Sequence, residues 1–509
     1  MARSQTALRA GRAVSCTLAI TLCVALCLLF LVGCPANDLR LYLARATGFN
    51  GELHVSITTG DDANPGTSAK PLRTIQAGIE LGKWYIDQGL AEAVDVKVAA
   101  GTYPQESVNG VLVELADRVS LFGGFPVDFS EYNPEAHITI IEDTSSGGEA
   151  EYIAAVQIGP EVTQATQLNG FTIIGGSCDA GYMQAVRVDS ASPDIGFNVI
   201  HAGGSTSAVS TFGASSPIIH DNTIVGSAGE HTWKAALIVV EGSNPGIEHN
   251  TIIGEGNDTF GDQCYGVYIA DTTVHTFYRN SVSGGIAGQS SAVFIDTAEV
   301  HLSENTITGG TATAPGEYAV GVNAGRDSEI HFHNNEVTAQ KAVFVEGPGS
   351  VIYAGGNTIS SVSETPDAFG IELLHGVGCE IFDNTITAEG IGVAALGIRI
   401  LSPPDSSHLY IADNSVTALV TSHDDESDQA VGIQVEDFDR AEVRRNEITA
   451  GPAYGGQGIR IFGGSGFADI IGNTVAVNGM EHFATGILYH DCNGRIESNV
   501  VNPGLVSAT

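Results

Sequence analysis

In the second half of the chain, charged and amide side chains recur at the same position of a repeated four-residue phrase, where they could act on a sugar. Glu372, Arg399 and Arg460 each take the third position of the phrases GIEL, GIRI and GIRI. Gln434 takes the same position in GIQV. A lyase needs a side-chain base and a cation that neutralises the sugar carboxylate, so the first three residues are the catalytic candidates if the chain is an enzyme. Otherwise Glu372 and Arg399 form a cross-strand ion pair of small energetic worth.

Aromatic residues take the same phase earlier in the chain. Tyr268, Phe294 and Phe344 occupy the third position of GVYI, AVFI and AVFV. Rings at neighbouring positions can stack on the faces of sugars, and together with Gln434 they are our predicted ligand-binding residues. The structural alternative is that these rings only pack against one another across strands.

Carboxylates near these positions could hold calcium, which favours several carboxylate oxygens. The candidate metal ligands are Asp61, Asp62, Asn64, Asp296, Glu346 and Glu436. Asp and Asn are also common turn formers, so the first three could simply shape a loop. His331 and His333 share one strand face, but they lack a third ligand nearby in the sequence, so we expect a surface pair. Calcium is the one cofactor that the sequence leaves open.

All of these residues lie within a long internal repeat. An asparagine followed two positions later by a β-branched residue recurs with a mean spacing of about 27 residues. The repeat asparagines are Asn198, Asn222, Asn250, Asn280, Asn305, Asn335, Asn357, Asn384, Asn414, Asn446, Asn473 and Asn499. One coil per repeat, stacked about 4.8 Å from the next, would place the asparagines in line at a turn. We therefore predict an all-β solenoid, a parallel β-helix of about 12–13 coils.

The alternation of small and aliphatic residues in the recurring phrases is typical of strands with one buried face. A β-propeller also repeats, but each of its blades needs about 40 residues or more. A leucine-rich repeat requires leucine at fixed offsets, which is absent here. Residues Leu72 to Gln88 have helical hydrophobic spacing between Pro71 and Gly89. We expect this helix to cover the open end of the first coil.

The segment between Gly60 and Tyr103 resembles a known family. Gly60–Thr67 (GDDANPGT), Pro71, Thr74–Ala77 (TIQA) and Ala100–Tyr103 (AGTY) resemble the start of pectate-lyase-like right-handed parallel β-helix proteins. With the asparagine repeats, the resemblance covers about residues 53 to 505. It implies the fold, but the superfamily includes lyases, hydrolases, epimerases, adhesins and bacterial lipoproteins of unknown function. The Asp-Pro-His motif of alginate epimerases is absent.

The N-terminus indicates export. A basic start is followed by an uncharged apolar run and by Leu31–Cys34 (LVGC), which resembles the lipobox of bacterial lipoproteins. By that resemblance Cys34 is lipidated; the alternative is an uncleaved membrane anchor. We expect a signal peptide at 1–33, a tether at 34–52, an N-terminal cap with the first coils at 53–130 and β-helix repeats at 131–509. The predicted location is extracytoplasmic: lipid-anchored in the cell envelope, at the outer membrane or cell surface.

The charge balance limits the partners. The chain has 59 acidic and 21 basic residues, a net charge of −38, which repels nucleic acid, anionic lipid and polyuronates. Four cysteines in the mature part are about a hundred residues apart, so we expect isolated thiols. The favoured function is a tethered, non-catalytic protein that binds a polysaccharide or another surface protein, or serves as envelope architecture. The alternative is a calcium-dependent polysaccharide lyase or epimerase that acts on an extracellular glycan.

Overall fold

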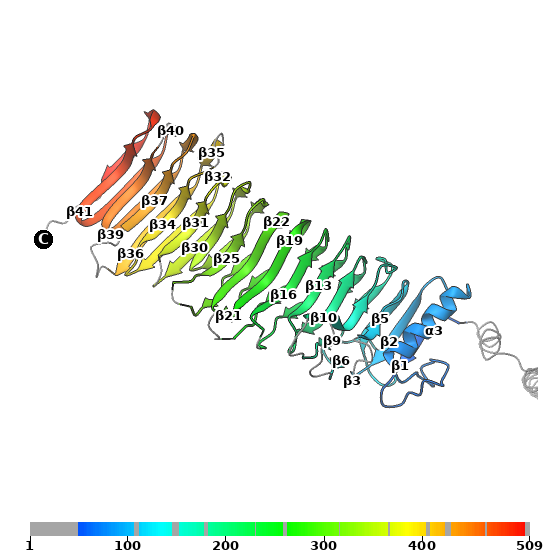
Figure 1. Cartoon of the computed structure of the whole chain (residues 1–509). Coiled ribbons are helices and arrows are strands. Elements are labelled where there is room, and N and C mark those ends of the chain that lie inside the picture. The colour runs from blue at the N-terminus through cyan, green and yellow to red at the C-terminus, as the bar shows by residue number, and fades with distance from the viewer. Residues whose placement is uncertain are drawn as a thin grey trace, which may run out of the picture.

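The computed structural model describes residues 49–503 except 106–110, 145–151, 178–181, 230, 258–261, 315, 365–366, 404–407, 423–428 and 464–465. These residues form an all-β parallel solenoid of about 13 turns, seen in Figure 1 as an elongated rod with stacked strands. The predicted fold class is therefore confirmed. The predicted signal peptide, the lipidated Cys34 and most of the tether lie outside the described residues.

Each full turn contributes strands to three long parallel sheets, which we name sheets A, B and C. Sheet A contains β4 (Val111–Glu114), β7 (Tyr152–Ile158), β10 (Tyr182–Asp189), β13 (Ser207–Phe212), β16 (Trp233–Val240), the first parts of β19 (Gln263–Tyr278) and β22 (Gln289–Ser303), β25 (Ala319–Ala324), β28 (Lys341–Glu346), β31 (Ala368–Leu374), β34 (Ala395–Leu401), β37 (Gln429–Glu436), and the last parts of β39 (Glu447–Phe462) and β41 (Thr474–His490).

Sheet B contains β1 (Glu52–Val55), β2 (Val94–Ala99), β5 (Val119–Phe125), β8 (Gln167–Asn169), β11 (Asp194–Gly196), β14 (Ile218–His220), β17 (Gly246–Glu248), the last parts of β19 and β22, β26 (Glu329–His333), β29 (Val351–Gly355), β32 (Gly378–Phe382), β35 (His408–Ala412), β38 (Arg440–Arg444), β40 (Phe467–Ile471) and β42 (Asn493–Glu497). The long strands β19 and β22 therefore belong to two sheets at once.

Sheet C contains β3 (Gly101–Gln105), β6 (Thr139–Asp143), β9 (Thr172–Ile174), β12 (Val199–His201), β15 (Thr223–Val225), β18 (Thr251–Ile253), β20 (Ser281–Ser283), β23 (Thr306–Thr308), β27 (Glu336–Ala339), β30 (Thr358–Ser363), β33 (Thr385–Ile391), β36 (Ser415–Ser422), the first parts of β39 and β41, and β43 (Val500–Pro503). The short strands β21 (Ile286–Ala287) and β24 (Thr311–Ala312) pair separately.

The core consists of aliphatic side chains that stack from coil to coil. In sheet A, for example, Ile371 pairs with Ile398, Ile398 with Ile433 and Ile433 with Ile459, and all four are fully buried. Burying an aliphatic side chain stabilises a fold by roughly 1.5–3 kcal/mol. Because alternate residues of each strand point outward, the same register that builds the core fixes the outer columns where ligands could bind.

The asparagine repeat lies at the turn between sheets B and C. In every step of the series, the backbone N–H and Nδ2 of one asparagine donate to Oδ1 of the next. The residue before each asparagine has a left-handed φ, as at Asp383 (56°) and Asp413 (59°). The predicted ladder is confirmed, and it satisfies polar groups that would otherwise be buried without partners.

A single described helix, α3 (Ile75–Asp87), lies at the N-terminal end of the rod, where Figure 1 shows it beside β1 and β2. Its N-cap is Thr74, whose side chain accepts a hydrogen bond from the N–H of Ala77. A Cβ added at Gly78 would lie 2.9 Å from Val96, so glycine allows the helix to approach the first coil closely. The predicted capping helix is confirmed, with bounds slightly inside the predicted 72–88.

The cysteines in the described part of the chain agree with the expectation of isolated thiols. Cys264, Cys379 and Cys492 are free, and burial raises the pKa of the Cys379 thiol to about 12. The fourth, Cys178, lies outside the described residues. Within residues 49–503, excluding the gaps given above, no helix has the length and hydropathy needed to cross a membrane.

Candidate functional site

The outer column of sheet A includes the predicted ligand-binding residues and the catalytic candidates. Consecutive strands pair the residues of this column directly, in the order Gln157, Arg187, Ser210, Ile238, Tyr268, Phe294, Asn323, Phe344, Glu372, Arg399, Gln434, Arg460 and Leu488. The sequence phase therefore predicts the true register of this sheet. The parts that these residues play in binding or catalysis stay predictions.

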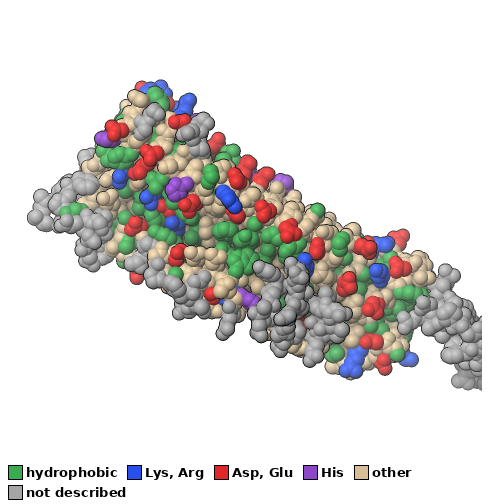
Figure 2. Space-filling view, in the orientation of Figure 1, with side chains coloured by type: hydrophobic (Ala, Val, Ile, Leu, Met, Phe, Trp, Pro, Cys, Tyr) green, Lys and Arg blue, Asp and Glu red, His purple; other side chains and the backbone are tan. Residues whose placement is uncertain are grey.

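Four rings form an aromatic patch on β16, β19 and β22, which we define as Trp233, Tyr265, Tyr268 and Phe294. Tyr268 and Phe294 stack nearly parallel, with centroids 5.3 Å apart and an interplanar angle of 7°. Trp233 meets Tyr268 edge-on at 5.0 Å, and Tyr265 lies 5.1 Å from Phe294. Figure 2 shows hydrophobic side chains gathered over the middle of the rod. Two of these rings were predicted as ligand-binding, whereas Trp233 and Tyr265 were not.

The pairing of strands β16, β19 and β22 brings the rings of the patch together. Tyr268 pairs with Ile238 on one side and Phe294 on the other, so large apolar side chains occupy three consecutive coils. Tyr265 is buried and burial raises the pKa of its phenol, whereas Trp233, Tyr268 and Phe294 are half-buried. Solvent therefore reaches part of each of these three rings, and the apolar C–H surface of a sugar can pack on such exposed ring surface.

A hollow of about 490 Å³ opens beside the patch. Its lining includes the amides of Gln263, Gln289 and Asn323 and the carboxylates of Asp296 and Glu346. Burial raises the pKa of Asp296. The combination of aromatic faces with amide and carboxylate groups around them can make both stacking contacts and hydrogen bonds to hydroxyl groups.

Next along sheet A, an ion cluster joins Lys341, Glu372 and Arg399. Oε2 of Glu372 lies 2.5 Å from Nζ of Lys341, and Oε1 lies 2.8 Å from Nη1 of Arg399. Glu372 is only 2% exposed. The ammonium of Lys341 also lies over the rings of Phe344 and Phe369, at 4.1 and 5.0 Å from their centroids. A carboxylate that is buried between two cations is not placed to remove a proton from a substrate.

The remaining predicted residues of the column are engaged with their neighbours. Gln434 is 6% exposed and donates from Nε2 to Glu436 at 2.7 Å. Arg460 lies over the ring of Phe462 at 4.4 Å and 3.8 Å from the Glu436 carboxylate. The strand of Gln434 lies between the strands of Arg399 and Arg460. At the usual spacing of strands, the backbones of these two arginines are about 9.6 Å apart. The structure thus orders the three catalytic candidates in one column without gathering them at a single point.

The calcium candidates near the N-terminus make hydrogen bonds to the backbone of the loop before α3. Oδ1 of Asp62 accepts the N–H groups of Arg73 and Thr74 at 2.8 and 2.9 Å. Oδ1 of Asp61 accepts the N–H of Ala63, and Nδ2 of Asn64 donates to a backbone carbonyl. These bonds match the turn-forming alternative.

The other calcium candidates are spread along sheet A. Asp296 and Glu346 both line the hollow beside the aromatic patch. Oε1 of Glu346 lies 3.0 Å from Nδ1 of His375 and accepts a hydrogen bond when that nitrogen carries the proton, so this carboxylate is already engaged. Glu436 lies three strands beyond Glu346 and is not part of the same group.

Comparison with known proteins agrees with this architecture. Residues 291–504 match the family described as a right handed beta helix region. The chain contains a right-handed β-helix. Residues 58–270 match a second family, which is described as protein of unknown function (DUF1565). No curated protein matches the chain.

Solved structures similar to this β-helix include three carbohydrate-active enzymes. The native lacto-N-biosidase of Eubacterium ramulus has 14% identity and a TM-score of 0.36, over 80% of this chain and 70% of that one. The alginate lyase of Paenibacillus sp. has 14% identity and a TM-score of 0.32, over 60% and 92%. The periplasmic alginate epimerase AlgG has 11% identity and a TM-score of 0.33, over 82% and 89%.

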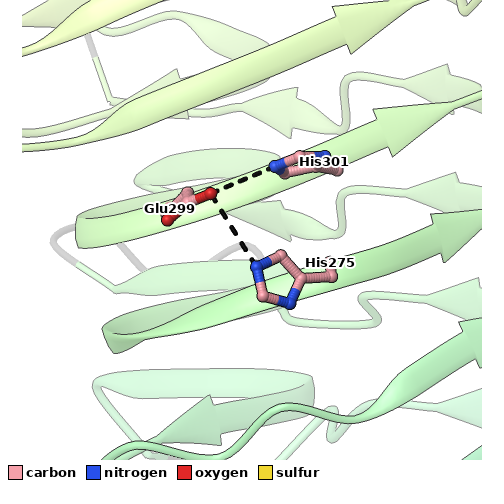
Figure 3. Close-up of side chains that lie close together, drawn as sticks. All are labelled: His275, Glu299 and His301. Carbon is pink, nitrogen blue, oxygen red and sulfur yellow. Dashed lines mark hydrogen bonds and ion pairs between the residues drawn. The ribbon is translucent and has the colours of Figure 1, made fainter.

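On sheet B, the β-helix brings together a group that the sequence reasoning missed, which we call the imidazole cluster: His275, Glu299 and His301 (Figure 3). Their ligand atoms all lie within 4.8 Å of one another. His331, which was expected to form a surface pair with His333 and to lack a third ligand nearby in the sequence, lies 3.1 Å from the carboxylate of Glu329, and its ring is 4.2 Å from that of His301. The missed signal is the tripeptide Glu-x-His, which occurs at 299–301 and again one coil later at 329–331.

Proposed function

We propose that this chain is a non-catalytic cell-envelope protein that binds a neutral glycan through the aromatic patch on sheet A. The observation that supports this most is the parallel pair Tyr268 and Phe294, half-buried beside a polar-lined hollow. Trp233 packs edge-on against Tyr268, and Tyr265 packs against both rings of the pair. Rings held in this way lose little conformational freedom when a ligand stacks on them.

The charge of the chain favours a neutral ligand. With a net charge of −38, and with Asp296 and Glu346 beside the patch, the surface repels polyuronates. Neutral sugars have hydroxyl groups that can donate to those carboxylates and accept from the amides of Gln263 and Asn323. A lipid anchor at Cys34 would hold this surface at the cell exterior, and that location belongs to the same proposal.

The burial of the ion cluster favours binding over cleavage. Glu372 lies between two cations and is almost inaccessible to solvent. In the described part of sheet A, Glu372 is the one acidic residue on the outer column between Tyr268 and Arg460. We therefore rank the calcium-dependent lyase or epimerase second, and we infer that the cluster supports Phe344 at the edge of the patch.

Tryptophan fluorescence can test the binding proposal, because the chain has two tryptophans and one of them is in the patch. The other, Trp84, lies in α3, so the W84F variant reports on Trp233 alone. Full-length protein in a detergent without a sugar head group is titrated with neutral gluco-, xylo-, manno- and N-acetylglucosamine oligosaccharides and with uronate oligosaccharides. We expect a saturable change with a neutral glycan and none with the uronates.

Ring deletions locate the binding surface. F294A and Y268A should each weaken binding by roughly ten-fold, the worth of about 1–1.5 kcal/mol in a stacking contact. Y410A, on sheet B, is the matched control and should bind as the parent does. Failure of every neutral glycan to change the fluorescence, or equal affinity in F294A and Y410A, would refute the proposed function.

A further inference from the structure

Sheet B carries a repeated Glu-x-His unit that the proposed glycan surface does not use. Glu299 and His301 on β22 pair in register with Glu329 and His331 on β26. In each unit the imidazole Nε2 faces the carboxylate of the same strand, at 3.2 Å for His301 and 3.1 Å for His331. Because alternate strand residues point to the same face, both units lie on the outer surface of the rod.

An irregularity in β19 brings a second imidazole to the first unit. Val274 pairs with Val300, but the next pair is Phe277 with Leu302, so β19 contains one residue more than β22 in this interval. Such a bulge re-aims the side chains next to it, and bulges are frequent at functional positions. Here His275 is turned toward β22, where its Nε2 lies 3.8 Å from Oε1 of Glu299.

We propose that His275, Glu299 and His301 form a binding site for a divalent first-row transition metal ion, best represented by zinc. Zinc binds imidazole nitrogens and carboxylate oxygens at about 2.0–2.2 Å, which puts tetrahedral ligands about 3.4 Å apart. The two contacts to Glu299 Oε1, at 3.2 and 3.8 Å, bracket that separation. Small side-chain rotations would bring all three atoms to one ion.

The donor set selects the class of metal. Two imidazoles and one carboxylate suit zinc, iron, nickel or copper, whereas calcium and magnesium favour oxygen ligands alone. The side chains of His275, Glu299 and His301 are 55%, 41% and 39% exposed. The site is therefore reached from solvent, and three protein ligands leave a fourth position for water or an oxygen ligand of a partner.

Asn244 on the preceding coil contacts His275 in a way that bears on metal binding. Asn244 lies 3.2 Å from Nδ1 of His275, and its Oδ1 accepts the backbone N–H of the same histidine at 3.2 Å. The amide therefore faces Nδ1 as a donor, although a metal-bound histidine prefers to donate its free N–H to an acceptor. An aspartate at position 244 would provide that acceptor and should strengthen metal binding through His275.

Isothermal titration with zinc tests the site in the full-length chain, purified without a histidine tag, stripped of metal and kept in excess magnesium to occupy oxygen-only sites. We expect one zinc ion per chain. H275A, H301A and E299Q should each weaken binding by roughly ten-fold or more, and N244D should strengthen it by about the same factor. Far-ultraviolet circular dichroism must show the parent β signal in each variant.

His408 provides the matched control, because it also faces a glutamate on sheet B, Glu442 at 3.0 Å, yet belongs to no three-ligand group among the described residues. H408A should bind zinc as the parent does. Absence of saturable zinc uptake by the parent, or equal affinity in H301A and H408A, would overturn the proposal. Neither result bears on glycan binding, since the aromatic patch lies on sheet A and is tested separately.

Discussion

Arg399 donates from Nη1 to Oε1 of Glu372 at 2.8 Å, across adjacent strands of sheet A. The second carboxylate oxygen meets Lys341 at 2.5 Å, so a nearly inaccessible anion holds two cations in place. Lys341 in turn packs on the rings of Tyr318, Phe344 and Phe369. Glu372 and Arg399, which the sequence offered either as catalytic candidates or as a cross-strand ion pair, are therefore joined to Lys341 in one network of ion pairs.

Removing Glu372 should destabilise the rod strongly. E372A leaves the buried ammonium of Lys341 without its anion, and breaking a buried ion pair from one side typically costs about 3–5 kcal/mol. R399A should cost less, because Arg399 is more exposed and Lys341 still neutralises Glu372. Urea unfolding of the two variants, followed by circular dichroism, gives the comparison. Equal losses of stability in both would contradict the buried network.

The sequence is enough to predict the coil repeat of the rod, but it does not show which outward-pointing side chains are buried. A strict phase of small and aliphatic residues is enough to predict the coil, the ladder and the register that pairs Tyr268 with Phe294. It cannot show that Glu372 on the outward phase is covered, because the cover comes from Lys341 on the preceding strand and from aromatic rings. The proposed metal site was missed for a related reason: His275 reaches Glu299 only through an extra residue in β19.

The asparagine ladder should be most sensitive to substitution at the middle of the rod. In N384A the backbone N–H and Nδ2 of Asn357 lose the acceptor that they contact at 2.9 and 2.8 Å. Each buried donor left without a partner costs about 1–3 kcal/mol, so we expect a loss of roughly 3 kcal/mol.

Asn499 is the natural comparison for that substitution. It accepts the same two bonds from Asn473, at 2.8 and 2.9 Å, but it is half-buried, so water can replace its side chain. N499A should therefore lower the unfolding temperature clearly less than N384A. A larger effect at position 499 would mean that the ladder stabilises the last coil more than the middle of the rod.

His220 should make the rod more stable in mild acid. Burial lowers the pKa of this imidazole, but hydrogen bonds to Asp221 at 2.9 Å and Asp194 at 2.8 Å outweigh it and raise the pKa above 6.5. Because the folded-state pKa is the higher one, the stabilisation is complete below about pH 6.5 and is lost as the pH rises through the folded value. The parent should therefore unfold at a higher temperature than H220Q in mild acid, and this difference should shrink as the pH rises through the folded-state pKa of His220.

His333 should act in the opposite direction and so serves as the control for pH. Its pKa is lowered by burial and by the neighbouring His331, so protonation is harder in the folded state than in the unfolded chain. Stability at this position is lost as the pH falls, and H333Q should reduce that loss. Identical pH profiles for H220Q and H333Q would show that neither environment perturbs its histidine as described.

The alternative enzymatic function predicts turnover, and we expect none. The full-length chain should release neither unsaturated sugar nor new reducing ends from pectate, alginate or neutral glycans, with calcium or with a chelator. The reason is geometric: Glu372 is inaccessible between two cations, Arg399 is bound to it, and Arg460 lies over Phe462 beside Glu436. Ultraviolet absorbance of the unsaturated product and a reducing-end assay provide the measurements. Calcium-dependent product that disappears in R460A, while R187A on the same column retains it, would place catalysis on sheet A and reverse the ranking of the two functions.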